Sequence, residues 1–271
     1  MDFPLGRKYF YREIQQPDEQ ISLERAALYL ALEEYPNLDV EAYLNALDTM
    51  AAEVEEGLPA GFYPLRILQS INQYLYEHLA FKGNASNYYD PDNSFLNQVI
   101  DRRTGIPITL ALVYLAIARR INFPMVGIGM PGHFLIRPTV DEMEIFVDAF
   151  HQGEILFLQD CQDRLAQVFG QPVPFQAEFL RPVTNRQFLA RMLTNLKVIY
   201  INRGDGPRAL AAIDRILLLF PQSATELRDR GLVHFQLNQL TQAQQDLEAY
   251  LTMAPDADDA ATIQQLLDQM K

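Results

Sequence analysis

The sequence predicts an α+β fold in which helical sections flank a small antiparallel sheet. Apolar side chains recur at helical spacing through the first 82 residues, whereas short apolar runs bounded by turn-forming residues follow between residues 125 and 148. After residue 184 the chain becomes helical again and shows an internal period of 34 residues. With 271 residues, 49% of them hydrophobic, the chain is long enough for one large domain or two modest ones with a real core.

The composition argues against two classes of partner. The chain has 22 basic and 35 acidic residues, and the resulting formal charge of -13 repels nucleic-acid phosphates. The most apolar run, residues 106–118, is shorter than the roughly 20 residues that a membrane span needs. The single cysteine, Cys161, and the absence of a signal-like apolar run in residues 1–8 favour the cytoplasm. We therefore expect no nucleic acid and no membrane among the partners.

Three helices are expected in the N-terminal section, residues 1–82. Tyr35-Pro36-Asn37 breaks the first helix, Asp39 is placed to cap the second, and Pro64 opens the third. The expected helices span residues 22–34, 40–54 and 64–81.

The middle section, residues 83–183, is expected to combine a loop, a buried helix and short strands. Residues 83–94 are dense in turn formers, and residues 95–101 can form a short helix. The run from Pro107 to Ile121 is nearly all apolar, so this helix must lie inside the domain. Strands are expected at residues 125–129, 134–136 and 144–148.

The C-terminal section, residues 184–271, carries the internal period. Pro221 and Pro255 lie 34 residues apart, and so do the small residues Ala209 and Ala243. This spacing predicts two helix-turn-helix units of the tetratricopeptide type, at about residues 190–221 and 224–255. Stacked helix pairs of this kind present surfaces that receive peptides, so we expect a protein or peptide partner.

Five motifs distinguish the middle section. They are Tyr89-Asp90-Pro91, Asn93-Ser94-Phe95-Leu96, the stretch from Arg102 to Leu110, Pro131-Gly132-His133-Phe134-Leu135 and Val147-Asp148-Ala149-Phe150. On these motifs the chain resembles the bacterial SirB-type transglutaminase-like proteins, which end in tetratricopeptide repeats. The resemblance implies a papain-like core. In the wider transglutaminase and cysteine-protease class it also implies a cysteine, a histidine and an aspartate in that chain order.

His133 and Asp148 correspond to the histidine and the aspartate of that class. His133 begins one expected strand and Asp148 ends the next, so antiparallel pairing would bring the imidazole and the carboxylate within hydrogen-bond reach. Such a carboxylate fixes the tautomer of a catalytic histidine. The alternative is a buried histidine that Asp148 satisfies for structural reasons.

The cysteine of the class has no counterpart at the start of the buried helix, which reads Gly105-Ile106-Pro107-Ile108-Thr109. Thr109 offers the nearby hydroxyl and is the candidate nucleophile, although a threonine early in a helix more often caps backbone N–H groups. Cys161 follows His133 and Asp148 in the chain and has acidic neighbours, which disfavour its thiolate.

His151 suggests a metal interpretation, because two histidines and a carboxylate form a known ligand set. It follows Asp148 by three residues, and His133 would complete the set. The spacing matches no HExxH-type helical register, so we expect neither a metal nor another cofactor.

Five residues are candidates for lining a cleft beside the pair. Arginine and asparagine side chains there can orient a peptide or an amide group, whereas the alternative for Asn93 is a turn or a helix cap. The candidates are Tyr89, Asn93, Arg102, Arg103 and His151.

Two functions follow from these residues. The first is a non-catalytic protein that binds a protein or peptide as a scaffold or regulatory module, through its repeats and its cleft. The alternative is a hydrolase or acyltransferase that acts on a peptide or amide bond. It would use His133 and Asp148 with Thr109, water or a metal as an atypical source of the nucleophile.

Overall fold

The computed structural model describes residues 4–58, 63–140 and 143–270 of the chain. The first three residues of the N-terminal segment considered for a secretory signal lie outside this range. The fold divides into two compact units, Met1–Leu189 and Ala190–Lys271. The first unit combines helices with two small sheets and the second is helical, which confirms the predicted α+β class.

The helices of the first unit start where the sequence offers caps. The Ser22 hydroxyl accepts a hydrogen bond from Arg25 N, the Asp39 carboxylate accepts one from Ala42 N, and Pro64 occupies the first turn of its helix. The helices are α1 (Leu5–Glu13), α2 (Leu23–Ala31), α3 (Val40–Glu56), α4 (Pro64–Asn72), α5 (Leu96–Arg102), α6 (Pro107–Arg120) and α7 (Leu158–Phe169).

Two of these helices end at least three residues before their predicted ends. α2 ends at Ala31, three residues before the expected end. α4 gives way at Gln73 to a π-helical segment, Gln73–His78, and the chain then turns through Ala80, whose φ is 57°. Apolar spacing alone does not distinguish a π-helical turn from an α-helical one, because both keep neighbouring turns on one face.

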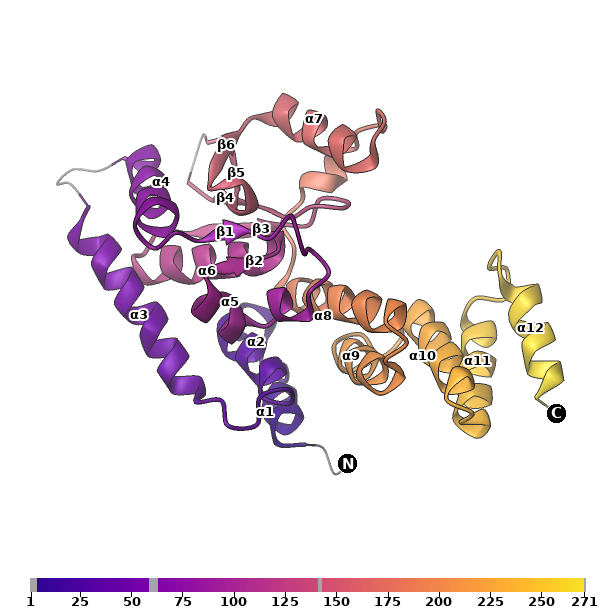
Figure 1. Ribbon diagram of the computed structural model, residues 1–271. Coiled ribbons are helices and arrows are strands. Elements are labelled where there is room, and N and C mark those ends of the chain that lie inside the picture. Colours follow the sequence, from indigo (N-terminus) through magenta and orange to yellow (C-terminus); the bar gives the residue numbers. More distant parts are fainter. Residues whose placement is uncertain (1–3, 59–62, 141–142, 271) are drawn as a thin grey trace. The chain divides into compact units, whose positions relative to one another are not determined.

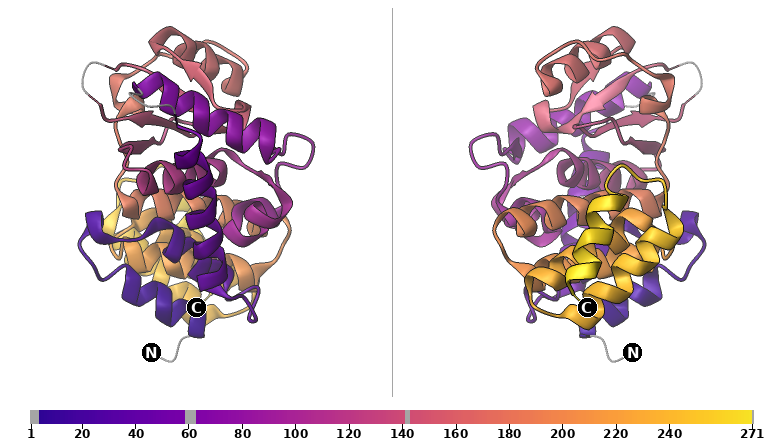
Figure 2. Two further views of the ribbon diagram at one scale, coloured as in Figure 1. Left: turned by 90° about the vertical axis from the view of Figure 1, so that its left-hand side faces the viewer. Right: turned by 90° about the vertical axis from the view of Figure 1, so that its right-hand side faces the viewer.

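The main sheet has four antiparallel strands in the order β3-β4-β5-β6. Ile136 on β4 pairs with Val147 on β5, which brings the start of β4 toward the end of β5. The helix α6 packs against β3 and β4, and α7 packs against β6 (Figure 1 and Figure 2). The strands are β3 (Met125–Ile128), β4 (Leu135–Pro138), β5 (Phe146–Asp148) and β6 (Glu154–Leu156).

Short elements complete the first unit. A two-residue parallel pair joins β1 (Lys82–Gly83) to β2 (Thr104–Gly105), and this pair brings the loop over residues 84–95 back to the start of α6. Short 3-10 helices lie at Asp18–Gln20, Pro91–Ser94, Ala149–His151 and Ala177–Leu180. α6 is buried along nearly all of its length, as its apolar sequence predicted.

The second unit consists of paired helices. α10 packs against both α9 and α11, and Ala209 and Ala243, which are 34 residues apart, are both fully buried. A Cβ at Gly231 would lie 2.7 Å from the Leu247 side chain, so α10 and α11 approach closely there. The helices are α8 (Asn185–Asn202), which begins in the first unit, α9 (Gly206–Leu219), α10 (Ala224–Gln236), α11 (Leu240–Met253) and α12 (Ala260–Gln269).

Ion pairs connect these paired helices. Lys197 Nζ on α8 lies 2.7 Å from Glu226 Oε1 and 2.9 Å from Asp229 Oδ2, both on α10. Arg230 on α10 joins Asp246 on α11 at 2.7 Å and Asp214 on α9 at 3.0 Å.

Throughout the described ranges, no helix combines the length and the apolar character that crossing a bilayer requires.

Candidate functional site

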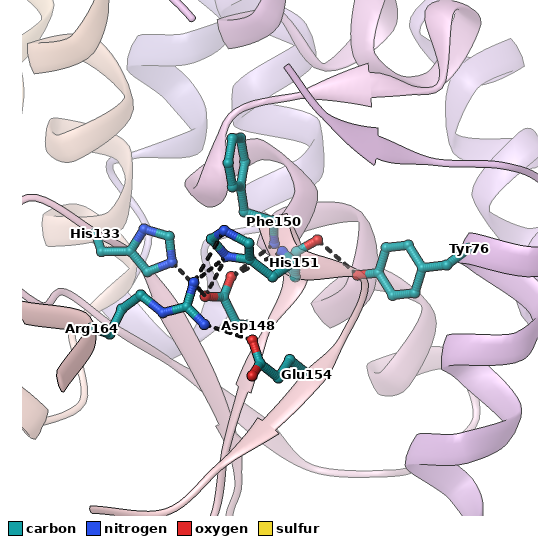
Figure 3. A network of polar contacts seen from close by, with 8 residues as sticks. Tyr76, His133, Asp148, Phe150, His151, Glu154 and Arg164 are labelled. Carbon is teal, nitrogen blue, oxygen red and sulfur yellow. Dashed lines mark hydrogen bonds and ion pairs between the residues drawn. The ribbon is translucent and has the colours of Figure 1, made fainter. Parts of the chain in front are cut away.

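His133 and Asp148 meet at the ends of neighbouring strands. His133 lies two residues before β4 and Asp148 is the last residue of β5, so the antiparallel register directs the two side chains together. His133 Nε2 lies 2.8 Å from Asp148 Oδ2 (Figure 3). The histidine is 7% exposed and the aspartate is fully buried. Within the described residues, the other ring nitrogen of His133, Nδ1, makes no hydrogen bond.

Asp148 is the centre of a larger polar network. Its Oδ1 accepts hydrogen bonds from the backbone N–H groups of Phe150 at 3.0 Å and His151 at 3.2 Å. Its Oδ2 also lies 2.9 Å from His151 Nδ1 and 3.5 Å from Arg164 Nη1. Arg164 extends from α7 and donates through its Nη2 to Glu154 on β6 at 2.6 Å (Figure 3). Arg164 therefore joins α7 to the sheet through the carboxylates of Asp148 and Glu154.

The network keeps the carboxylate ionised. Burial alone would raise the pKa of Asp148, but hydrogen bonds and positive charge from His133, and then from His151, outweigh burial and lower the pKa to about 2. Nearby, the Tyr76 hydroxyl donates a hydrogen bond to Ala149 O at 3.0 Å. Burial, followed by the charge of Asp148, raises the pKa of Tyr76 above its ordinary value, so this phenol stays protonated.

The Thr109 hydroxyl is engaged in the first turn of α6. Its Oγ1 is placed to donate to Asn93 O at 2.7 Å, and it accepts the Ile106 N–H at 3.1 Å. Thr109 is fully buried, and a Cβ at Gly105 would lie 2.8 Å from its oxygen. The hydroxyl therefore caps the helix and ties it to the preceding loop.

Cys161 faces the core on α7. It is fully buried in an apolar cluster with Leu156 and Leu165. Burial raises the pKa of its thiol to about 12, with a further contribution from the negative charges of Asp160 and Asp148. The thiol is therefore protonated and inert at neutral pH.

Three ligand-type atoms of the network could in principle surround a metal ion. The nearest ligand atoms of His133, Asp148 and His151 all lie within 4.8 Å of one another. However, Arg164 Nη1 lies 2.7 Å from His151 Nδ1, the same atom that faces the carboxylate. The guanidinium already neutralises Asp148 and would repel a cation placed among these ligands, so the residues present fit a salt-bridge network better than a metal centre.

Asn93, one of the cleft candidates, is fully buried. Its Nδ2 donates to Asn87 O at 2.8 Å and to Tyr88 O at 3.2 Å, and its Oδ1 accepts from Asn84 Nδ2 at 3.0 Å. These bonds use both ends of the amide, so Asn93 shapes the loop that carries Tyr88.

The two arginine candidates have partners of their own. Arg102 bonds Asp90 at 2.9 Å and Asp92 at 3.1 Å. Arg103 ends α5 in the left-handed region, with φ of 52°, and its guanidinium lies 4.9 Å from the centre of the Phe81 ring. Among the described residues, neither guanidinium has a contact with His133 or Asp148.

Tyr89 is linked to the pair through a series of ring contacts. Tyr89 is 63% exposed and meets Tyr88 edge-on, and Tyr88 meets Phe150 at 6.1 Å between ring centres. Phe150 in turn lies 6.3 Å from His133 and 5.2 Å from His151. An aromatic path thus leads from the surface to the buried pair.

Sequence reasoning missed Arg164, Glu154 and Tyr76 as members of this network. Arg164 is the one cation close to the acidic run 159–163, which is a weak signal for a charge partner of Asp148. No local pattern points to Tyr76, because its contact with Ala149 O depends on the packing of the π-helical segment.

Comparisons with known proteins place the chain in a family. The sequence of residues 41–194 matches the family model of the Transglutaminase-like superfamily. The sequence of residues 196–268 matches the family model of the Tetratricopeptide repeat. The first match spans more than half of the chain, which therefore belongs to the transglutaminase-like superfamily. The second match agrees with the paired helices predicted from the 34-residue period.

Relatives occur in bacteria and in mammals. A UPF0162 protein of Xylella fastidiosa strain 9a5c is 39% identical over 88% of this chain and 86% of its own length. A UPF0162 protein of Pseudomonas aeruginosa is 27% identical over 93% of this chain and 92% of its own length. F-box only protein 21 of the mouse is 28% identical over 83% of this chain, which corresponds to 40% of that protein.

Proposed function

We propose that this chain is a non-catalytic transglutaminase-like protein of the SirB type. It binds a protein or peptide partner in the cytoplasm and acts as a scaffold or regulatory module through its repeats and cleft. The observation that carries the proposal is the state of the Thr109 hydroxyl. It is fully buried and bonded to Asn93 O and the Ile106 N–H, so its proton is not directed at His133.

Cys161, the remaining candidate nucleophile, is also unsuited to attack a substrate. A thiol needs its thiolate form to attack, and Cys161 is buried with a pKa raised to about 12. The pair of His133 and Asp148 then has a structural role. With His151 and Arg164 it joins β4, β5 and α7 through one ionised carboxylate.

The second unit supports the binding part of the proposal. Its helices match a repeat family whose surfaces receive peptides, and it exposes apolar side chains that a partner can cover. Among them are Val198, Ile201, Phe235, Leu240 and Met253, each between 36% and 44% exposed. The ion pairs of Lys197 and Arg230 hold the helices that present these side chains.

Capture of partners by variants of the full chain tests this proposal. Leu240→Glu and Phe235→Glu place a charge on exposed positions of the repeats, and Leu65→Glu is the matched control on α4 of the first unit. A protein identified in the source organism's lysate should remain on the wild type and on Leu65→Glu, and both repeat variants should lose it. Equal retention by all four proteins would contradict repeat-mediated binding.

One observation favours the alternative of a hydrolase or acyltransferase. The imidazole and carboxylate keep the geometry of a general-base pair, and within the described residues Nδ1 of His133 makes no hydrogen bond. Activated water would then be the nucleophile. Release of ammonia from a glutamine peptide, which attack by this water would produce together with glutamate, is the test. Turnover by the wild type that His133→Ala abolishes, with the fold retained, would establish the enzyme and overturn the non-catalytic proposal.

A further inference from the structure

The outer edge of β3 is only partly covered. Thr139 N donates to Pro124 O at 3.0 Å, so these two residues form a hydrogen-bonded pair. Hydrogen-bonded and non-hydrogen-bonded pairs then alternate along β3 and β4. In an antiparallel ladder the intervening residues, Met125 and Gly127, direct their backbone N–H and C=O groups to the opposite edge. Val183 N donates to Gly127 O at 3.0 Å, as this alternation requires.

The covering segment stops before it reaches Met125. Pro182 forms an isolated bridge with Ile128, and the chain then turns into α8, where the Thr184 hydroxyl accepts from Gln187 N at 3.2 Å. Within the described residues, the backbone N–H and C=O of Met125 have no partner at the outer edge. They remain available to another extended chain.

An apolar cavity of about 530 Å³ lies beside this edge, entirely within the first unit. Its size is that of pockets that hold a large side chain or a small molecule. The side chains of α6, β3, the segment just before α8 and the start of α8 provide most of its apolar wall. They include Leu112, Leu115, Met125, Val126, Val183 and Phe188.

The charges at the rim favour a basic partner. Glu24 is 3% exposed and bonds both Arg119 and Arg120, and Arg120 also bonds Asp48 at 2.6 Å, so this group of four is neutral overall. Glu19 also lines the cavity, is exposed, and makes no ion pair with any described residue. Glu19 therefore gives the mouth a net negative charge, within a chain whose formal charge is -13.

We propose that the edge of β3 at Met125, together with the adjoining cavity, binds an extended peptide segment of another protein. The segment carries a large apolar side chain next to a lysine or arginine. Its backbone pairs with the N–H and C=O of Met125, its apolar side chain enters the cavity, and its cation pairs with Glu19. The site does not involve the repeat surface, so its failure and the failure of repeat-mediated binding are separable.

A synthetic peptide panel tests the proposal on the full chain. The probes are acetylated hexapeptides Ser-Thr-X-Lys-Thr-Ser in which X is Phe, Leu, Ile, Met, Trp or Tyr. Control peptides have alanine at X, or glutamate in place of the lysine. Binding is followed by amide NMR shifts of the ¹⁵N-labelled protein up to about 1 mM peptide. We expect at least one apolar probe to shift the Met125 and Gly127 amides, and both control versions to bind about tenfold more weakly or worse.

Two variants locate the binding. Leu115→Gln makes the cavity wall polar at a half-buried position and should weaken the best probe about tenfold. Glu19→Lys should reverse the preference, so that the glutamate version binds better than the lysine version. Glu55→Lys, the same change at an exposed site on α3, should leave both affinities unaltered. Far-UV circular dichroism confirms that each variant is folded.

Several results would overturn the proposal. They are the absence of binding across the panel, shifts confined to amides away from β3, and affinities that neither Leu115→Gln nor Glu19→Lys changes. A Met125 shift that grows with protein concentration in the absence of peptide would assign the edge to a second copy of this chain instead. Loss of repeat-mediated capture in the Leu240→Glu variant has no bearing on these outcomes.

Discussion

Replacing Asp148 by asparagine removes the charge that joins His133, His151 and Arg164. The side chain is fully buried, and asparagine cannot offer two equivalent anionic oxygens to these donors. Breaking a buried ionic network in this way costs about 3–5 kcal/mol. We expect Asp148→Asn to lower the free energy of unfolding of the first unit by about that amount at pH 7.

Part of this cost depends on pH in a way that identifies its origin. Although burial alone raises the pKa of Asp148, His133 and His151 lower it from 3.8 to about 2. A lowered pKa in the folded state contributes stability that is fully present above the unfolded value of 3.8. That stability is lost as the pH falls from about 5 to about 2. The difference between 3.8 and about 2 corresponds to about 2.5 kcal/mol.

Urea unfolding at pH 7, 5 and 3 measures both the total destabilisation by Asp148→Asn and the share of it that depends on pH. Because the two compact units can unfold separately, amide NMR signals of β5 report the first unit alongside circular dichroism of the whole chain. The stability gap between wild type and Asp148→Asn should narrow as the pH falls from 5 to 3. Asp163→Asn, an exposed change on α7, is the control and should give no gap. A gap that is the same at all three pH values would show that the ionisation of Asp148 contributes nothing to stability.

Three further predictions concern positions outside the pair. Lys197→Met should destabilise the second unit by about 3 kcal/mol in urea unfolding, because it removes the ion-pair partner of Glu226, which is only 7% exposed. Unchanged stability would show that this ion pair is dispensable. Gly83→Ala should cost about 1–3 kcal/mol and move the Phe150 ring signals, because a Cβ there would lie 2.6 Å from that ring. Cys161 should resist Ellman's reagent at pH 8 in the native protein and react after unfolding, because it is buried with a pKa of about 12; rapid native reaction would contradict its placement.

Much of the fold was predictable because its signals are local. Asp39 and Pro64 mark helix starts by their own chemistry, and both helices begin where these residues predict. The approach of His133 to Asp148 was predictable from the order of the strands, because successive antiparallel strands place the start of one beside the end of the next. The repeat helices followed from the 34-residue spacing of Ala209 and Ala243.

The features that escaped prediction depend on packing between distant segments. The parallel pair of β1 and β2 has two residues in each strand, too few for an alternating pattern. The strand β6 lies in a run too short to separate from the turns around it. Arg164 reaches Asp148 from a helix whose own sequence shows acidic and apolar positions but no target for the guanidinium.

The intact mass of a captured partner, after incubation with the wild type and with His133→Ala, tests whether the protein is non-catalytic. We expect the partner to bind both proteins and to keep an unchanged mass, because neither Thr109 nor Cys161 offers a nucleophile to His133. A change in partner mass that appears with the wild type and disappears with a folded His133→Ala variant would show instead that the pair of His133 and Asp148 is catalytic.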